Sequence, residues 1–177
     1  MSFCLILLAA GNSNRFKSNI PKPYHKIAGK TLLEIALEKA SNFRQIKKFI
    51  IVYRKKDYKI IKKLDLKNVV LVEGGSTRQQ STFNALKFLI KTNKIKKVLI
   101  HDAARPNYSS KLIKKIIKNM STFKAVIPYL KIQDAIKQKY GSGMYEYIVG
   151  KNRKDLFLTQ TPQAFYLKEI YNLHKIR

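Results

Sequence analysis

Five short apolar segments recur along this chain, and they predict strands buried in a sheet. Each is almost wholly apolar, contains β-branched or aromatic residues and is shorter than a typical helix. The segments are Phe3–Leu8, Phe49–Tyr53, Val69–Val72, Val98–Ile100 and Ala125–Tyr129.

Between these segments, apolar residues recur at helical spacing and predict amphipathic helices. The clearest is Thr31–Ala40, in which Glu34 and Glu38 fall on the polar side. We expect Thr31 to cap this helix, because Glu34 three residues later would complete a capping box. The other helical patterns are Tyr58–Leu64, Gln80–Ile90, Ser110–Asn119 and Leu167–Ile176.

Strands that alternate with helices predict a three-layer α/β/α fold with a mostly parallel, Rossmann-like sheet. In such sheets ligands bind beyond the carboxyl ends of the strands. The loops after Leu8, Val72 and Ile100 are therefore expected at one edge of the sheet.

The pattern changes over residues 131–151, where Gly141-Ser142-Gly143 separates Ala135–Tyr140 from Met144–Val149. This pattern predicts a hairpin-like β excursion from the sheet, either a surface flap or an arm that reaches a second subunit. Repeats and low-complexity linkers are lacking, so residues 1–177 are expected to form a single domain.

Small and polar residues follow the first strand. Backbone N–H groups of Ala9-Ala10-Gly11-Asn12 would surround an anion closely, and the Arg15 guanidinium would bind phosphate oxygens. A strand that merely ends in a turn would show similar residues. The patterns G-x-x-x-x-G-K-[ST] and G-x-G-x-x-G are both absent, which argues against a P-loop NTPase or a typical dinucleotide dehydrogenase.

Three further segments carry candidate chemistry, and each also has a purely structural interpretation. Lys22 lies between two prolines, so it is either a rigidly held phosphate ligand or a solvated turn lysine. The loop Glu73–Ser81 has paired glycines suited to a base or phosphate, or is a strand-to-helix turn capped by Ser76 or Thr77. Asp102, in a chain with few acids, is a candidate Mg²⁺ ligand, whereas His101 is expected to be structural.

The charge is strongly positive, since 37 Lys and Arg residues against 10 Asp and Glu residues give a net charge of +27. Such a charge suits a nucleic-acid-binding protein. The lysines are spread over nearly every polar position, however, and no nucleic-acid-binding motif accompanies them. We favour a solvated surface that also attracts anionic substrates.

The single cysteine, Cys4, excludes an internal disulfide and suggests a reducing cytoplasm. No apolar run approaches the length of a membrane span.

Together these segments resemble the 2-C-methyl-D-erythritol 4-phosphate cytidylyltransferase family of the sugar nucleotidyltransferases. The resemblance extends over the whole chain in unbroken order. It rests on Leu8-Ala9-Ala10-Gly11 with Arg15-Phe16, Pro21-Lys22, Gly74-Gly75 with Arg78 and Ser81, His101-Asp102-Ala103-Ala104-Arg105-Pro106, and Gln160-Thr161-Pro162-Gln163-Ala164-Phe165. The related ribitol-phosphate enzymes more often have His-Asp-Ser-Val-Arg-Pro in the fourth motif.

The resemblance implies transfer of CMP from CTP to the alcohol phosphate, with release of pyrophosphate and with Mg²⁺ as cofactor. It also implies a homodimer clasped through the 131–151 arm. The implied roles are triphosphate binding by Ala9, Ala10, Gly11 and Asn12, catalysis by Arg15, Lys22 and Arg153, cytosine binding by Gly75, Ser76 and Ser81, Mg²⁺ and substrate binding by Asp102, and alcohol-phosphate binding by Arg105, Arg153 and Thr161.

The chain departs from the family pattern at three places. Ser76 replaces a usual acid, and Ala135 replaces a common threonine. The chain also stops at Arg177, before the Thr-Asp-Glu and Ile-Lys-x-Thr segments of the family. We therefore expect a C-terminally truncated fragment with weak activity and reduced stability. The alternatives are a ribitol-5-phosphate or other sugar-phosphate nucleotidyltransferase and, from another class, a basic RNA-binding protein.

Overall fold

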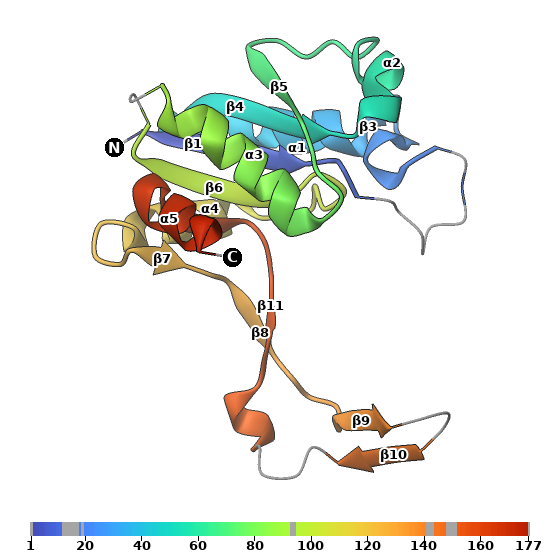
Figure 1. Ribbon diagram of the computed structural model, residues 1–177, viewed down its shortest axis with the longest axis vertical. Coiled ribbons are helices and arrows are strands. Elements are labelled where there is room, and N and C mark those ends of the chain that lie inside the picture. Colours follow the sequence, from blue (N-terminus) through green and yellow to red (C-terminus); the bar gives the residue numbers. More distant parts are fainter. Residues whose placement is uncertain are drawn as a thin grey trace.

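The computed structural model describes residues 2–11, 18, 20–92, 95–140, 144–147 and 152–176 (Figure 1). Within these residues the main sheet has the strand order β5-β4-β1-β6-β12-β7. The first four of these strands are parallel to one another, and β12 is antiparallel to both of its neighbours. The strands are β1 (Phe3–Leu8), β4 (Ile46–Tyr53), β5 (Val69–Glu73), β6 (Lys97–Asp102), β7 (Ala125–Val126) and β12 (Gln163–Tyr166).

Helices cover both faces of this sheet, which confirms the three-layer fold (Figure 1). Alternate residues of β1 face opposite layers: Leu5 and Leu7 pack in the cluster that contains α1 and α4 residues, whereas Cys4 and Ile6 pack with α3 and α5. Burial raises the pKa of the Cys4 thiol, in keeping with its place in the core. The helices are α1 (Leu32–Ser41), α2 (Tyr58–Ile61), α3 (Arg78–Ile90), α4 (Ser110–Asn119) and α5 (Leu167–Lys175).

Three expectations about the elements need correction. The expected strand Ala125–Tyr129 is two strands, because Pro128 has no N–H to continue the hydrogen bonding. Its second part begins β8, which leaves the main sheet. The pattern did not predict β12 as a strand, and α2 ends at Ile61 rather than at Leu64.

The predicted excursion exists as an arm that extends away from the sheet (Figure 1). At its base β8 (Tyr129–Lys131) pairs with β11 (Phe157–Thr159), and at its tip β9 (Lys137–Tyr140) pairs antiparallel with β10 (Met144–Tyr147). This confirms the hairpin, although the turn residues 141–143 lie outside the described residues. The remaining short elements are the 3-10 turns η1 (Lys22–Tyr24), η2 (Lys55–Asp57) and η3 (Arg153–Asp155) and the paired strands β2 (Lys26–Ile27) and β3 (Lys30–Thr31).

Among the described residues, no helix has the length and apolar character that a lipid bilayer crossing requires.

The capping box expected at the start of α1 is confirmed. The Glu34 N–H donates to Thr31 Oγ1 over 3.2 Å, and the Thr31 N–H donates to the Glu34 carboxylate over 2.7 Å. Thr31 is buried, so its hydroxyl satisfies the Glu34 N–H at a position with little access to solvent.

We expect Thr31→Ala to lower the free energy of unfolding by about 1 kcal/mol, since it leaves the Glu34 N–H without its acceptor. Thr31→Ser keeps the hydroxyl and is the matched control. Urea denaturation of both variants checks the prediction, and equal stabilities of the alanine and serine variants would contradict it.

The loops after β1 and β5 are in close contact. A Cβ on Gly74 would lie 2.6 Å from the Ala10 Cβ and 2.8 Å from the Ser81 Oγ, so only a glycine fits there. Around Gly11, which follows the same strand as Ala10, no atom of the described residues other than its chain neighbours lies within 4 Å of the position its Cβ would take.

We expect Gly74→Ala to lower the free energy of unfolding by about 1–3 kcal/mol, because the added methyl group overpacks this contact. Gly11→Ala should change it by less than about 0.5 kcal/mol, since its Cβ would contact no atom of the described residues beyond its chain neighbours. Thermal unfolding of the two variants makes the comparison, and a fully stable Gly74→Ala protein would show that the two loops are not packed together.

Candidate active site at the carboxyl ends of the strands

A cavity of about 410 Å³ lies where β1 and β6 end and α3 begins. It gathers side chains from segments that are far apart in the sequence, as the parallel sheet predicts. The expected site residues that line it are Ala10, Gly11, Lys22, Ser76, Ser81, Asp102 and Arg105. A larger cleft of about 560 Å³ lies against α1, and its charged residues include the ion pair Lys30–Glu38.

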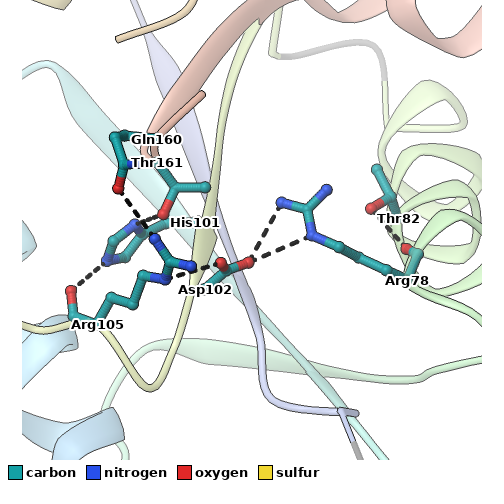
Figure 2. A network of polar contacts seen from close by, with 7 residues as sticks. All are labelled: Arg78, Thr82, His101, Asp102, Arg105, Gln160 and Thr161. Atoms are coloured by element: carbon teal, nitrogen blue, oxygen red, sulfur yellow. Dashed lines mark hydrogen bonds and ion pairs between the residues drawn. The ribbon is translucent and has the colours of Figure 1, made fainter. Parts of the chain in front are cut away.

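Asp102 is the acidic residue of this cavity, and two arginines contact its carboxylate (Figure 2). Arg78, the first residue of α3, donates to Oδ1 from Nε and Nη2 over 3.3 and 3.2 Å. Arg105 Nε lies 3.3 Å from Oδ2. No role was expected for Arg78, although it belongs to the motif Gly74-Gly75 with Arg78 and Ser81, which was a usable signal.

His101 is fully buried next to Asp102 and links two segments of the site (Figure 2). Its Nε2 lies 2.9 Å from the Arg105 carbonyl oxygen, and its Nδ1 lies 2.8 Å from the Thr161 Oγ1. Burial lowers the pKa of His101 to about 4, so its imidazole is neutral at pH 7. The expectation that His101 is structural rather than a metal ligand fits this environment.

Lys22 reaches the cavity from a turn that is anchored in the core. Pro21, Pro23 and Tyr24 are buried around it, and the Tyr24 N–H donates to the Pro21 carbonyl over 2.9 Å. Burial raises the pKa of the Tyr24 hydroxyl. The turn therefore holds its backbone rigidly while the Lys22 side chain stays exposed beside the cavity.

The loop before α3 is held by hydrogen bonds of its own side chains. The Gly75 N–H donates to Ser81 Oγ over 3.1 Å, which ties the glycine pair to the first turn of the helix. Thr77 rather than Ser76 is the cap, since its Oγ1 accepts from the Gln80 N–H over 3.0 Å. Ser76 is thus left as a lining residue of the cavity.

The structure does not bring all expected residues to this cavity, and Gly75 and Thr161 are not among the residues that line it. The Ala9 N–H donates to the Val52 carbonyl over 2.8 Å, so it is not available to a phosphate, and the expected role of that group is wrong. Arg153 lies on the arm, where it lines a separate cavity of about 300 Å³ and donates to the Gln133 carbonyl over 2.8 Å. Asn12 and Arg15 lie outside the described residues.

Among the described residues, no group of three or more His, Cys, Asp or Glu side chains could hold a metal ion. Asp102 is a single carboxylate with 28% of its side chain exposed, at the wall of the cavity. Mg²⁺ commonly binds to one or two carboxylates together with substrate phosphates and water. The residues therefore fit Mg²⁺ that arrives with a nucleotide better than a cation held by protein side chains alone.

Comparisons with known proteins agree with this geometry. The family model described as IspD, 2-C-methyl-D-erythritol 4-phosphate cytidylyltransferase, matches residues 3–177. The bifunctional enzyme IspD/IspF of Pelagibacter ubique is 43% identical over 173 residues, which cover 98% of this chain and 45% of that protein. The 2-C-methyl-D-erythritol 4-phosphate cytidylyltransferase of Thermosipho africanus is 36% identical and is matched over 72% of its length.

Solved structures give the same result. The crystal structure of 4-diphosphocytidyl-2C-methyl-D-erythritol synthase from Anaerococcus prevotii matches 99% of this chain and 74% of its own, with a TM-score of 0.79 and 35% identity. The bifunctional IspDF of Campylobacter jejuni matches with a TM-score of 0.82 and 27% identity, over 44% of its chain. This chain thus spans less than half of the bifunctional relatives and about three quarters of the shorter ones. Because the family model covers nearly every residue, the chain belongs to the 2-C-methyl-D-erythritol 4-phosphate cytidylyltransferase family.

Proposed function

We propose that this chain transfers CMP from CTP to 2-C-methyl-D-erythritol 4-phosphate and releases pyrophosphate, in a reducing cytoplasm. The observation that carries the proposal is the single cavity that Gly11, Lys22 and Asp102 line together in a chain of this family. Relatives that are 36–43% identical are named for this activity or for a bifunctional enzyme that includes it.

The nucleotide would occupy the part of the cavity between the loops after β1 and β5. Backbone N–H groups of Ala10, Gly11 and Asn12 would bind the triphosphate, since small residues allow close approach. The cytosine would lie against the loop that Ser81 holds. Of the residues assigned to cytosine, Ser76 and Ser81 line the cavity, and Gly75 is hydrogen-bonded to Ser81.

Positive charge would stabilise the reaction at the α-phosphate. The attacking phosphate oxygen of the alcohol phosphate is already ionised at pH 7, so the site needs no strong general base. Lys22 and Arg15 would stabilise negative charge that builds up as pyrophosphate leaves. Catalysis then rests on alignment of the two substrates and on fixed cations, as in other phosphoryl-transfer sites.

The second substrate would bind near the network around Asp102. Arg105 and Thr161 are held there by contacts to Asp102 and His101. Asp102 would hold Mg²⁺ with the phosphates of the nucleotide, and the ion would supply charge neutralisation. Two arginines close to one carboxylate give this side of the cavity a positive balance that suits an alcohol phosphate.

The arm supports a homodimer. Its base exposes Tyr129, Leu130, Phe157 and Leu158, each at least 45% exposed, and the rings of Tyr129 and Phe157 pack 4.4 Å apart. Exposed apolar side chains gathered on one ribbon are typical of an interaction surface. Because Arg153 lies on the arm rather than at the cavity of its own chain, we assign it to the cavity of the partner.

We expect Asp102→Ala and Lys22→Ala each to lower pyrophosphate release from CTP and 2-C-methyl-D-erythritol 4-phosphate by roughly 100-fold or more. Asp65→Ala, which removes an exposed carboxylate outside the cavity, is the control. An enzyme-coupled pyrophosphate assay makes the measurement. Unchanged release in both variants would reject the assigned roles, and faster release with ribitol 5-phosphate would reject the substrate.

Mixing two inactive variants tests the exchange of Arg153 between subunits. In the proposed dimer, each site combines Asp102 of one chain with Arg153 of the other. When an Asp102→Ala chain pairs with an Arg153→Ala chain, one site carries both substitutions and the other carries neither, so a mixed dimer holds one complete site. We expect an equal mixture to recover roughly a quarter of the original activity, because half of the dimers are mixed and each retains one of two sites. Sedimentation confirms the dimer, and a mixture as inactive as its parts would contradict the exchange.

A further inference from the structure

Figure 2 shows the two hydrogen bonds of His101, to Arg105 and to Thr161. Together they fix which group donates the hydrogen in the bond between His101 and Thr161. His101 is fully buried, and its two ring nitrogens contact the Arg105 carbonyl oxygen and the Thr161 hydroxyl over 2.9 and 2.8 Å. Its ring also meets the edge of Tyr108, with ring centroids 4.9 Å apart. Within the described residues, the imidazole thus has a hydrogen-bond acceptor, a hydroxyl and an aromatic ring as direct contacts.

The Arg105 carbonyl settles which nitrogen carries the hydrogen. A carbonyl oxygen only accepts, so Nε2 must carry the hydrogen and donate it. Among the described residues, the ring forms hydrogen bonds to Arg105 and Thr161. The neighbouring Asp102 carboxylate is paired with Arg78 and Arg105 instead. Burial of a ring without a carboxylate hydrogen-bond partner disfavours an imidazolium. In the neutral ring Nδ1 has a lone pair and no hydrogen, so Thr161 donates its hydroxyl hydrogen to Nδ1.

This direction determines what Thr161 offers to a ligand. A hydroxyl has one hydrogen, and when Nδ1 receives it, Oγ1 keeps only lone pairs. An ionised phosphate oxygen also has only lone pairs and cannot bond to it. A hydroxyl group of a sugar alcohol can donate to it.

We propose that His101 is a positioning residue that makes Thr161 a hydrogen-bond acceptor, so that Thr161 binds a hydroxyl group of the alcohol phosphate and not its phosphate group. The inference rests on the proposed function and adds to it which group of the alcohol phosphate Thr161 binds. Phosphate recognition is then left to the cationic side chains, among them Arg105, whose NH1 is oriented by Gln160 Oε1 over 3.1 Å.

The hydrogen-bond direction is measurable in the unmodified chain. Long-range nitrogen–proton NMR correlations of the three histidines distinguish a protonated ring nitrogen from an unprotonated one. We expect His101 to show a hydrogen on Nε2 and none on Nδ1 at pH 7. A hydrogen on Nδ1 would overturn the inference, whatever the substrate is.

The substrate group is measurable by titration calorimetry with 2-C-methyl-D-erythritol 4-phosphate and with analogues in which each hydroxyl in turn is replaced by hydrogen. We expect Thr161→Val to weaken binding of the complete substrate roughly 3- to 10-fold. One analogue should bind with the same affinity to the unmodified chain and to Thr161→Val, because this analogue lacks the hydroxyl that Thr161 contacts. Thr161→Ser should keep the affinity, and Thr122→Val, at an exposed threonine distant in sequence, is the matched control.

His101→Gln tests positioning separately from folding. It should weaken binding of the complete substrate but not of the same analogue, in a protein whose thermal unfolding shows that it is folded. An equal loss for every analogue, in either the valine or the glutamine variant, would overturn the assignment. If the unmodified chain fails to bind the complete substrate, the proposed function is overturned, and so is the assignment of a substrate hydroxyl to Thr161. The NMR result on the direction of the hydrogen bond does not depend on that outcome.

Discussion

Parallel hydrogen bonding on both sides of β1 is the constraint on which this site depends. In the register of the sheet, Leu8 lies opposite Val52 on one side and Asp102 on the other. The three strands therefore end at one edge, and the loops that follow them are brought together. Because β1 is buried on both faces, it has no polar side chains to offer, and the chemistry is confined to the loops.

Electrostatics at this edge are set by one carboxylate among several cations. Arg78 and Arg105 both contact Asp102, and Lys22 lines the same cavity. Buried His101 adds no charge, because desolvation lowers its pKa to about 4. The cavity is thus positive and largely preorganised, and such a site stabilises developing negative charge without having to reorganise during the reaction.

The arm holds Arg153 apart from the other residues of the proposed site in the same chain. Its apolar base is exposed, and its Arg153 is held by the Gln133 carbonyl away from the cavity that Asp102 lines. A β ribbon that leaves the sheet cannot be stabilised by the core of its own domain, so packing against a second copy would stabilise it. This arrangement is the basis of the proposal that the site draws on two chains.

The sequence by itself determined the elements and loops whose signals are local. Apolar runs predicted the parallel strands, Thr31 and Glu34 predicted a cap, and glycines and alanines marked where the backbone is approached closely. Tertiary structure decided what depends on distant residues: the added strand β12, the split at Pro128, and the contact of His101 with Thr161 across 60 residues. Local patterns reflect neighbours along the chain, whereas hydrogen-bond partners across the fold are chosen by packing. For this reason the contact between Thr161 and His101 emerged only from the structure.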